Sequence, residues 1–94
     1  MQVEVISEQE EESGLKFSIT FGGEACTLSL SWADYNLWSP DGTRPPSIVA
    51  VAVLRVLLEH GPEKIPASLD ASVLRRLIDG GDQLVSRELG SGSS

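Results

Sequence analysis

The stretch from Pro46 to His60 is the feature that most limits how this chain can fold. It follows one proline and precedes Gly61-Pro62, and such boundaries are typical of a helix. Helical spacing places four residues on one narrow stripe. The remaining surface of the helix is apolar around about two-thirds of the circumference. The stripe consists of Ile48, Ala52, Arg55 and Glu59. We therefore expect a helix that must be covered on two sides.

A buried strand over Ile48–Val53 is the alternative, because β-branched valines lower helix propensity slightly. The length of the stretch and its flanking prolines favour the helix. Gly61 is expected at the left-handed cap position, and Pro62 prevents the helix from continuing.

The chain before this helix alternates between apolar and polar residues, as strands do when one face is buried. The alternation is strict over Leu15–Phe21, recurs over Cys26–Trp32 and is short over Gln2–Ser7. Gly22-Gly23 suits a tight hairpin turn between the first two of these. We expect a three-stranded antiparallel meander in which Cys26 faces the core and Trp32 lies at its edge.

Five residues, Glu8–Glu12, carry four glutamates, and Ser13-Gly14 follows them. Like charges repel one another, so the run predicts a solvated hairpin loop. An acidic finger for a cationic partner is the alternative.

The end of the chain predicts one or two shorter helices. Ser68 or Asp70 can cap the first, Gly80-Gly81 ends it, and Asp82 can cap the second. The apolar side of the first comprises Leu69, Val73, Leu74, Leu77 and Ile78, and that of the second comprises Leu84, Val85 and Leu89. The fold class is therefore α+β, βββαα(α), in one domain over 1–89 with a disordered Gly/Ser tail over 90–94.

The composition suits a folded, cytoplasmic protein. The 94 residues suffice for one modest core, and 40% of them are hydrophobic. The single cysteine cannot form an internal disulfide, which fits a reducing compartment. No signal peptide is expected at the start, and no apolar run approaches the length of a membrane span.

The net charge of −7 is concentrated in the strand half of the chain. Residues 1–42 contain eight acidic residues and Lys16 alone as a base, whereas residues 43–94 contain six of each. Binding to nucleic acid or an anionic membrane needs clustered bases, so neither is expected. Arg75 and Arg76 are predicted to pair with Asp79, one helical turn away.

Candidate chemistry is sparse. His60 is the only histidine, and its place near a helix C-terminus suits an interaction with unpaired carbonyls rather than catalysis. Cys26 should be a buried thiol rather than a nucleophile. We expect no catalytic residue, metal or cofactor.

Aromatic residues gather in the segment 31–46, between the strands and the long helix. They either cover the open end of the core or form a contact surface, because tryptophan and tyrosine are enriched in binding hot spots. The predicted partner-binding residues are Tyr35, Leu37, Trp38, Asp41 and Arg44.

We therefore expect a small non-catalytic interaction or assembly module that binds a protein partner or itself, as a homo-oligomer. One alternative is a small enzyme or accessory subunit with a shallow site over residues 34–44. The other is an acidic mimic that antagonises a nucleic-acid-binding protein.

Overall fold

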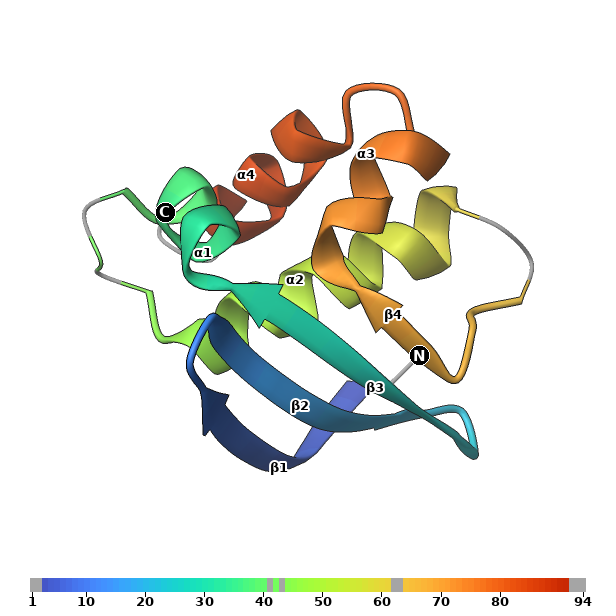
Figure 1. Cartoon of the computed structure of the whole chain (residues 1–94). Helices are drawn as coiled ribbons and strands as arrows, with labels where there is room; N and C mark the ends of the chain where they lie inside the picture. Colours follow the sequence, from blue (N-terminus) through green and yellow to red (C-terminus); the bar gives the residue numbers. More distant parts are fainter. Residues whose placement is uncertain (1–2, 41, 43, 62–63, 92–94) are drawn as a thin grey trace.

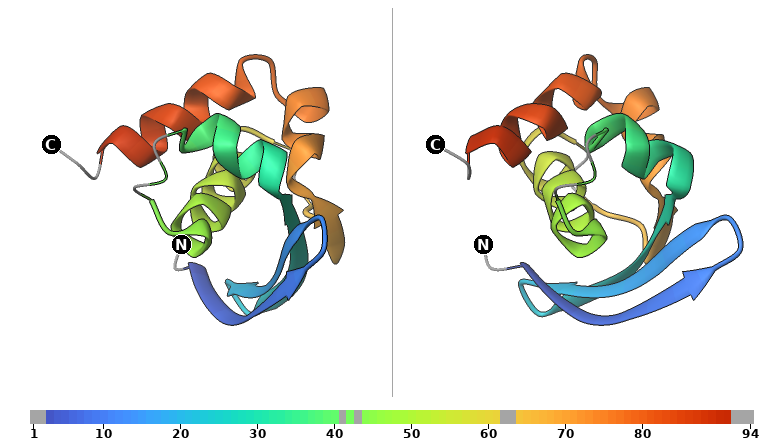
Figure 2. Two further views of the ribbon diagram at one scale, coloured as in Figure 1. Left: turned by 60° about the vertical axis from the view of Figure 1, so that its left-hand side comes forward. Right: turned by 90° about the vertical axis from the view of Figure 1, so that its left-hand side faces the viewer.

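The computed structural model describes residues 3–40, 42, 44–61 and 64–91, and it forms two layers (Figure 1). One layer is a four-stranded sheet with the order β1-β2-β3-β4, and the helices are stacked over one of its faces (Figure 2). The strands are β1 (Val3–Glu11), β2 (Gly14–Phe21), β3 (Glu24–Ser31) and β4 (Ser68–Asp70). The first three form the predicted antiparallel meander, so the α+β class is confirmed.

The second layer is helical. It comprises α1 (Trp32–Trp38), α2 (Pro46–His60), the 3-10 helix η1 (Ala71–Val73), α3 (Leu74–Leu77) and α4 (Gly81–Ser91). Helix α4 includes the first two residues of the predicted tail, and residues 92–94 lie outside the described part of the chain.

The acidic run is mostly strand: Glu8–Glu11 belong to β1, and the predicted hairpin loop is confined to its end, so the extent of that loop was predicted wrongly. Glu8 pairs with Phe17 and Glu10 with Leu15, and the turn lies at Glu12-Ser13. Successive side chains of a strand point to opposite faces, which separates neighbouring glutamates and reduces their repulsion. Lys16 also lies 3.5 Å from Glu11 across the hairpin and offsets part of the charge.

The hairpin between β2 and β3 is confirmed. Gly22 and Gly23 have φ angles of 55° and 82°, the left-handed conformations that a tight hairpin turn requires and glycine adopts without strain. The register places Leu15 opposite Leu30 and Phe17 opposite Leu28. The apolar side chains of the two strands therefore share one face.

Trp32 does not end the third strand, contrary to prediction. The hydroxyl of Ser31 accepts a hydrogen bond from the Asp34 amide at 3.1 Å and caps α1, so the chain turns into a helix at this point. The Trp32 side chain is consequently 37% exposed rather than at the core edge.

The helix predicted after residue 68 is divided into β4, η1 and α3. The Thr27 amide donates to the Ala67 carbonyl at 2.8 Å, and β4 pairs in parallel with β3. Pairing with the open edge of β3 thus overrides the helical pattern there. The Asp70 carboxylate does cap η1, but Leu77, predicted on the apolar side, is 46% exposed.

Helix α2 has the predicted bounds, but its end differs from prediction. Gly61 has a φ of −92° and is therefore extended rather than left-handed. A Cβ atom at this position would lie 2.5 Å from the Leu57 carbonyl oxygen. Glycine is needed here for close approach to the last helical turn.

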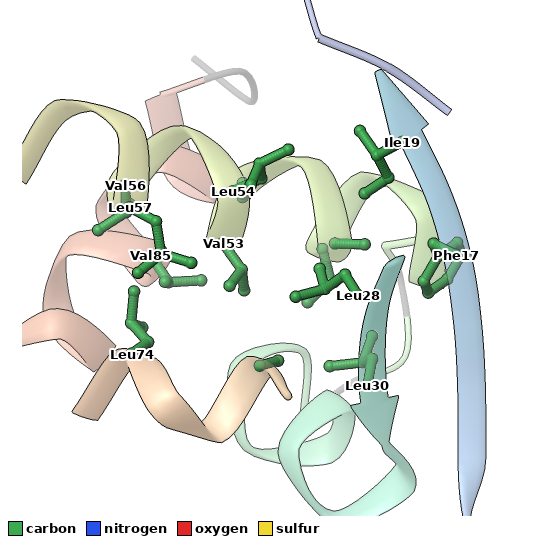
Figure 3. Close-up of a cluster of buried hydrophobic side chains, with 14 of the residues drawn as sticks. Phe17, Ile19, Leu28, Leu30, Val53, Leu54, Val56, Leu57, Leu74 and Val85 are labelled. Atoms are coloured by element: carbon green, nitrogen blue, oxygen red, sulfur yellow. The ribbon is translucent and has the colours of Figure 1, made fainter. Parts of the chain in front are cut away.

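Helix α2 is covered on two sides by the chain itself. One side packs on β1 and β2, and the other contacts α4. Figure 3 shows its buried side chains between those of the sheet and those of the C-terminal helices. These core side chains include Phe17, Ile19, Leu28, Leu30, Val53, Leu54, Val56, Leu57, Leu74 and Val85. A partner is therefore not required to bury these two sides. Of the predicted narrow stripe, Ile48, Arg55 and Glu59 are exposed, whereas Ala52 is buried.

Candidate functional site

The predicted partner-binding residues that the structure describes differ widely in exposure. Trp38 is buried with 5% exposure, whereas Leu37, its neighbour on α1, is 55% exposed. Tyr35 is half-buried, and its hydroxyl donates a hydrogen bond to the Arg44 carbonyl. Asp41 lies outside the described residues. Trp38 thus closes the core, and Leu37 points away from it.

Four side chains, one of them Trp38, join three helices into a cluster, here called the Arg75 clasp. It consists of Asp34 and Trp38 from α1, Arg75 from α3 and Asp82 from α4. Arg75 lies 2.9 Å from a carboxylate oxygen of Asp34 and 2.9 Å from one of Asp82. The indole nitrogen of Trp38 donates to the other Asp82 oxygen at 2.9 Å. The Arg75 guanidinium also lies 5.3 Å from the Trp38 ring centroid, within the range of a cation–π contact.

The predicted pair between Arg75 and Asp79 is replaced by this clasp. Helix α3 ends at Leu77, and Ile78 is extended, so Asp79 is not one helical turn from Arg75. Sequence spacing identifies a partner on the same helix only if the helix continues.

The clasp ties α1, α3 and α4 together through charged and hydrogen-bonded side chains. The Asp34 side chain is 12% exposed, and Arg75 lies against it. Burial lowers the pKa of Arg75, but the hydrogen bonds and charges of Asp34 and Asp82 together raise it above its ordinary value. Arg75 therefore remains charged at any physiological pH.

Two open hollows of about 220 Å³ each lie on α2, and Arg55 lines both of them. One is bounded by α4 and the other by β1. The first is lined by Arg44, Ile48, Val51, Ala52, Arg55, Glu88 and Leu89, and the second by Val3, Arg55, Leu58 and Glu59. We call these residues together the α2 groove. Ile48 is 47% exposed and gives it an apolar surface.

Sequence reasoning identified only Arg44 of the α2 groove as a candidate site residue. The stripe of Ile48, Ala52, Arg55 and Glu59 was nevertheless visible in the helical spacing, and all four residues line the groove. The walls, Val3 and Leu89, come from opposite ends of the chain, and no sequence pattern associates them with α2.

Other reactive groups are dispersed. The His60 imidazole lies 3.7 Å from the Glu59 carboxylate, on the exposed last turn of α2. Over the described ranges, no three histidine, cysteine or acidic side chains gather as they would around a metal ion. No helix in the described part of the chain has both the length and the apolar character to cross a membrane.

Cys26 is expected to resist thiol reagents in the folded protein. Its side chain is 4% exposed, and burial raises the pKa of the thiol, so the reactive thiolate is scarce at neutral pH. Labelling with a disulfide reagent such as Ellman's should be slow in buffer and fast in urea, followed by absorbance. Equal rates under the two conditions would contradict the buried position.

Comparison of the chain with protein-family models, with curated proteins and with solved structures gives no match.

Proposed function

We propose that this protein is a small non-catalytic assembly module that associates with a second copy of itself through the α2 groove. The observation that carries the proposal is the α2 groove itself. This groove lies on the long helix α2 and includes the half-exposed side chain of Ile48. Apolar surface in a shallow groove is typical of protein contact sites.

The charge distribution supports self-association at this face. The α2 groove carries two arginines, Arg44 and Arg55, and two glutamates, Glu59 and Glu88. A two-fold interface brings the same patch of each copy together, so charged groups on that patch can pair only if both signs are present. Residues 1–42 hold the whole net charge of −7. Contact through those residues would therefore meet stronger like-charge repulsion than contact through the α2 groove.

The alternatives have less support. An enzyme using residues 34–44 would need free polar groups, but Asp34 is bound to Arg75 and Tyr35 to the Arg44 carbonyl. A phosphate-like acidic track would need a longer row of carboxylates on one face, and the described part of the acidic run supplies two, Glu8 and Glu10, because Glu11 points to the opposite face. A reducing, cytoplasmic location remains part of the proposal and fits the single buried thiol, Cys26.

The proposal is tested by changing the charge of the α2 groove. Ile48→Glu places a carboxylate in the centre of the proposed interface, where its desolvation is unfavourable. Leu77→Glu is the matched control, because Leu77 is 46% exposed, Ile48 is 47% exposed, and Leu77 is not in the groove. Sedimentation equilibrium at micromolar concentrations should give concentration-dependent dimers for wild type and for Leu77→Glu, and monomers for Ile48→Glu. A wild-type protein that stays monomeric would overturn the self-association.

A further inference from the structure

Strand β1 has a free edge. It is the first strand in the order β1-β2-β3-β4 and pairs with β2 alone among the described strands. In an antiparallel pair, alternate residues direct both backbone groups away from the partner strand, so about four residues of β1 present unpaired N–H and C=O groups. Figures 1 and 2 show β1 at the outer margin of the sheet, with the helices stacked over the face. This edge is open to an additional strand.

The free edge is acidic on both faces of the sheet. Glu8 and Glu10 point to the same face as their partners Phe17 and Leu15, whereas Glu11 points to the opposite face. All three glutamates are exposed. Lys16 on β2 lies 3.5 Å from the Glu11 carboxylate and forms an ion pair with it.

A β-bulge and an exposed apolar side chain bound the acidic part of the edge. The register shifts between Val5 and Ser7, which leaves Ile6 as the extra residue. Ile6 is 59% exposed, the highest value among the large apolar side chains described as exposed. The regular edge after the bulge is Ser7–Glu11, and Ile6 provides an apolar contact at its start.

From these features we infer that the Ser7–Glu11 edge binds an extended, lysine- or arginine-rich segment of another protein, which adds to the sheet as a fifth strand. The backbone of the added strand pairs with the free groups of β1, as in other cases of strand addition. Side chains directly opposite in adjacent strands lie about 4.5–5.5 Å apart, so basic residues of the segment meet Glu8 and Glu10. An apolar residue at one end of the segment would pack on the exposed side chain of Ile6.

The acidic charge of this edge disfavours two other occupants. A second copy of β1 would place glutamates opposite glutamates, which is destabilising, and a nucleic acid would meet the same repulsion. This contact is independent of the proposed self-association, because β1 contributes only Val3 to the α2 groove, and Val3 precedes the bulge.

The test uses a short peptide of alternating lysine and valine, labelled with a fluorophore, and measures its binding by fluorescence anisotropy at low salt. The double variant Glu8→Gln/Glu10→Gln should bind it about tenfold more weakly than wild type, because two cross-strand charge pairs are lost. Wild-type binding should also weaken as salt is raised. The amides of Ser7–Glu11 that point away from β2 should become protected from hydrogen exchange on binding.

Two controls separate strand addition from general charge attraction. Glu24→Gln/Asp79→Asn removes the same charge from two exposed positions outside Ser7–Glu11 and should leave binding unchanged. A peptide of the same charge with N-methylated amides cannot donate backbone hydrogen bonds and should not bind. Equal loss in both double variants, equal binding of the methylated peptide, or no binding at all would overturn the inference. Ile48→Glu should bind the peptide as wild type does, whatever its oligomeric state.

Discussion

Replacing Leu54 by alanine is expected to lower the free energy of unfolding by about 2–5 kcal/mol. Leu54 is fully buried on α2, the helix that the sheet and α4 cover from two sides. Its truncation removes apolar contacts and leaves a cavity that a close-packed core cannot fully close. In a domain of this size such a loss is a large share of the total stability.

Leu37→Ala is the matched control, because it makes the same chemical change in another helix at a side chain that is 55% exposed. Its effect should be within about 0.5 kcal/mol. Urea denaturation followed by tryptophan fluorescence compares the two variants with wild type. A similar cost at both positions would contradict the placement of α2 at the centre of the core.

Replacing Arg75 by methionine is expected to cost about 1–3 kcal/mol of unfolding free energy. Methionine keeps much of the apolar stem but removes the guanidinium, so the nearly buried carboxylate of Asp34 loses its ion pair. Asp82 keeps its bond from Trp38 but loses the one from Arg75. We place the cost below that of breaking a fully buried pair, because the Arg75 side chain is 34% exposed and water screens part of the interaction.

Arg76→Met is the control for this prediction, since Arg76 is adjacent and exposed. Its effect should be negligible. The loss of unfolding free energy in Arg75→Lys should lie between those of Arg76→Met and Arg75→Met. An ammonium group retains the charge but not the geometry that reaches two carboxylates. A double-mutant cycle with Asp34→Asn isolates the pair, and an interaction energy near zero would contradict the clasp.

Local patterns identified the elements whose residues are close in sequence. The strict alternation of Leu15–Phe21 predicted β2, and the prolines at 45 and 46 predicted the start of α2. Both signals depend on the backbone and on immediate neighbours. The same local view failed for the acidic run, because the stability of that part of β1 comes from pairing with β2.

The Arg75 clasp was harder to predict because it depends on contacts between distant parts of the chain. Arg75 forms an ion pair with Asp34, although Asp79 is nearer in sequence and was the partner that helical spacing predicted. Trp38 likewise donates its indole N–H to Asp82, which lies on α4, 44 residues further along the chain. The cap at Ser31 was the one local signal that was missed, and it would have predicted α1.

The central claim is that the protein associates with itself through the α2 groove and not through its acidic sheet. It is tested most directly by following backbone amide chemical shifts in NMR spectra while the protein is diluted. We predict that concentration-dependent shifts are confined to Val3, Arg44, Ile48–Glu59 and the Glu88-Leu89 turn of α4, and that Ile48→Glu abolishes them. Shifts that cluster on Ser7–Glu11 of β1, or spectra that do not change with concentration, would contradict the claim.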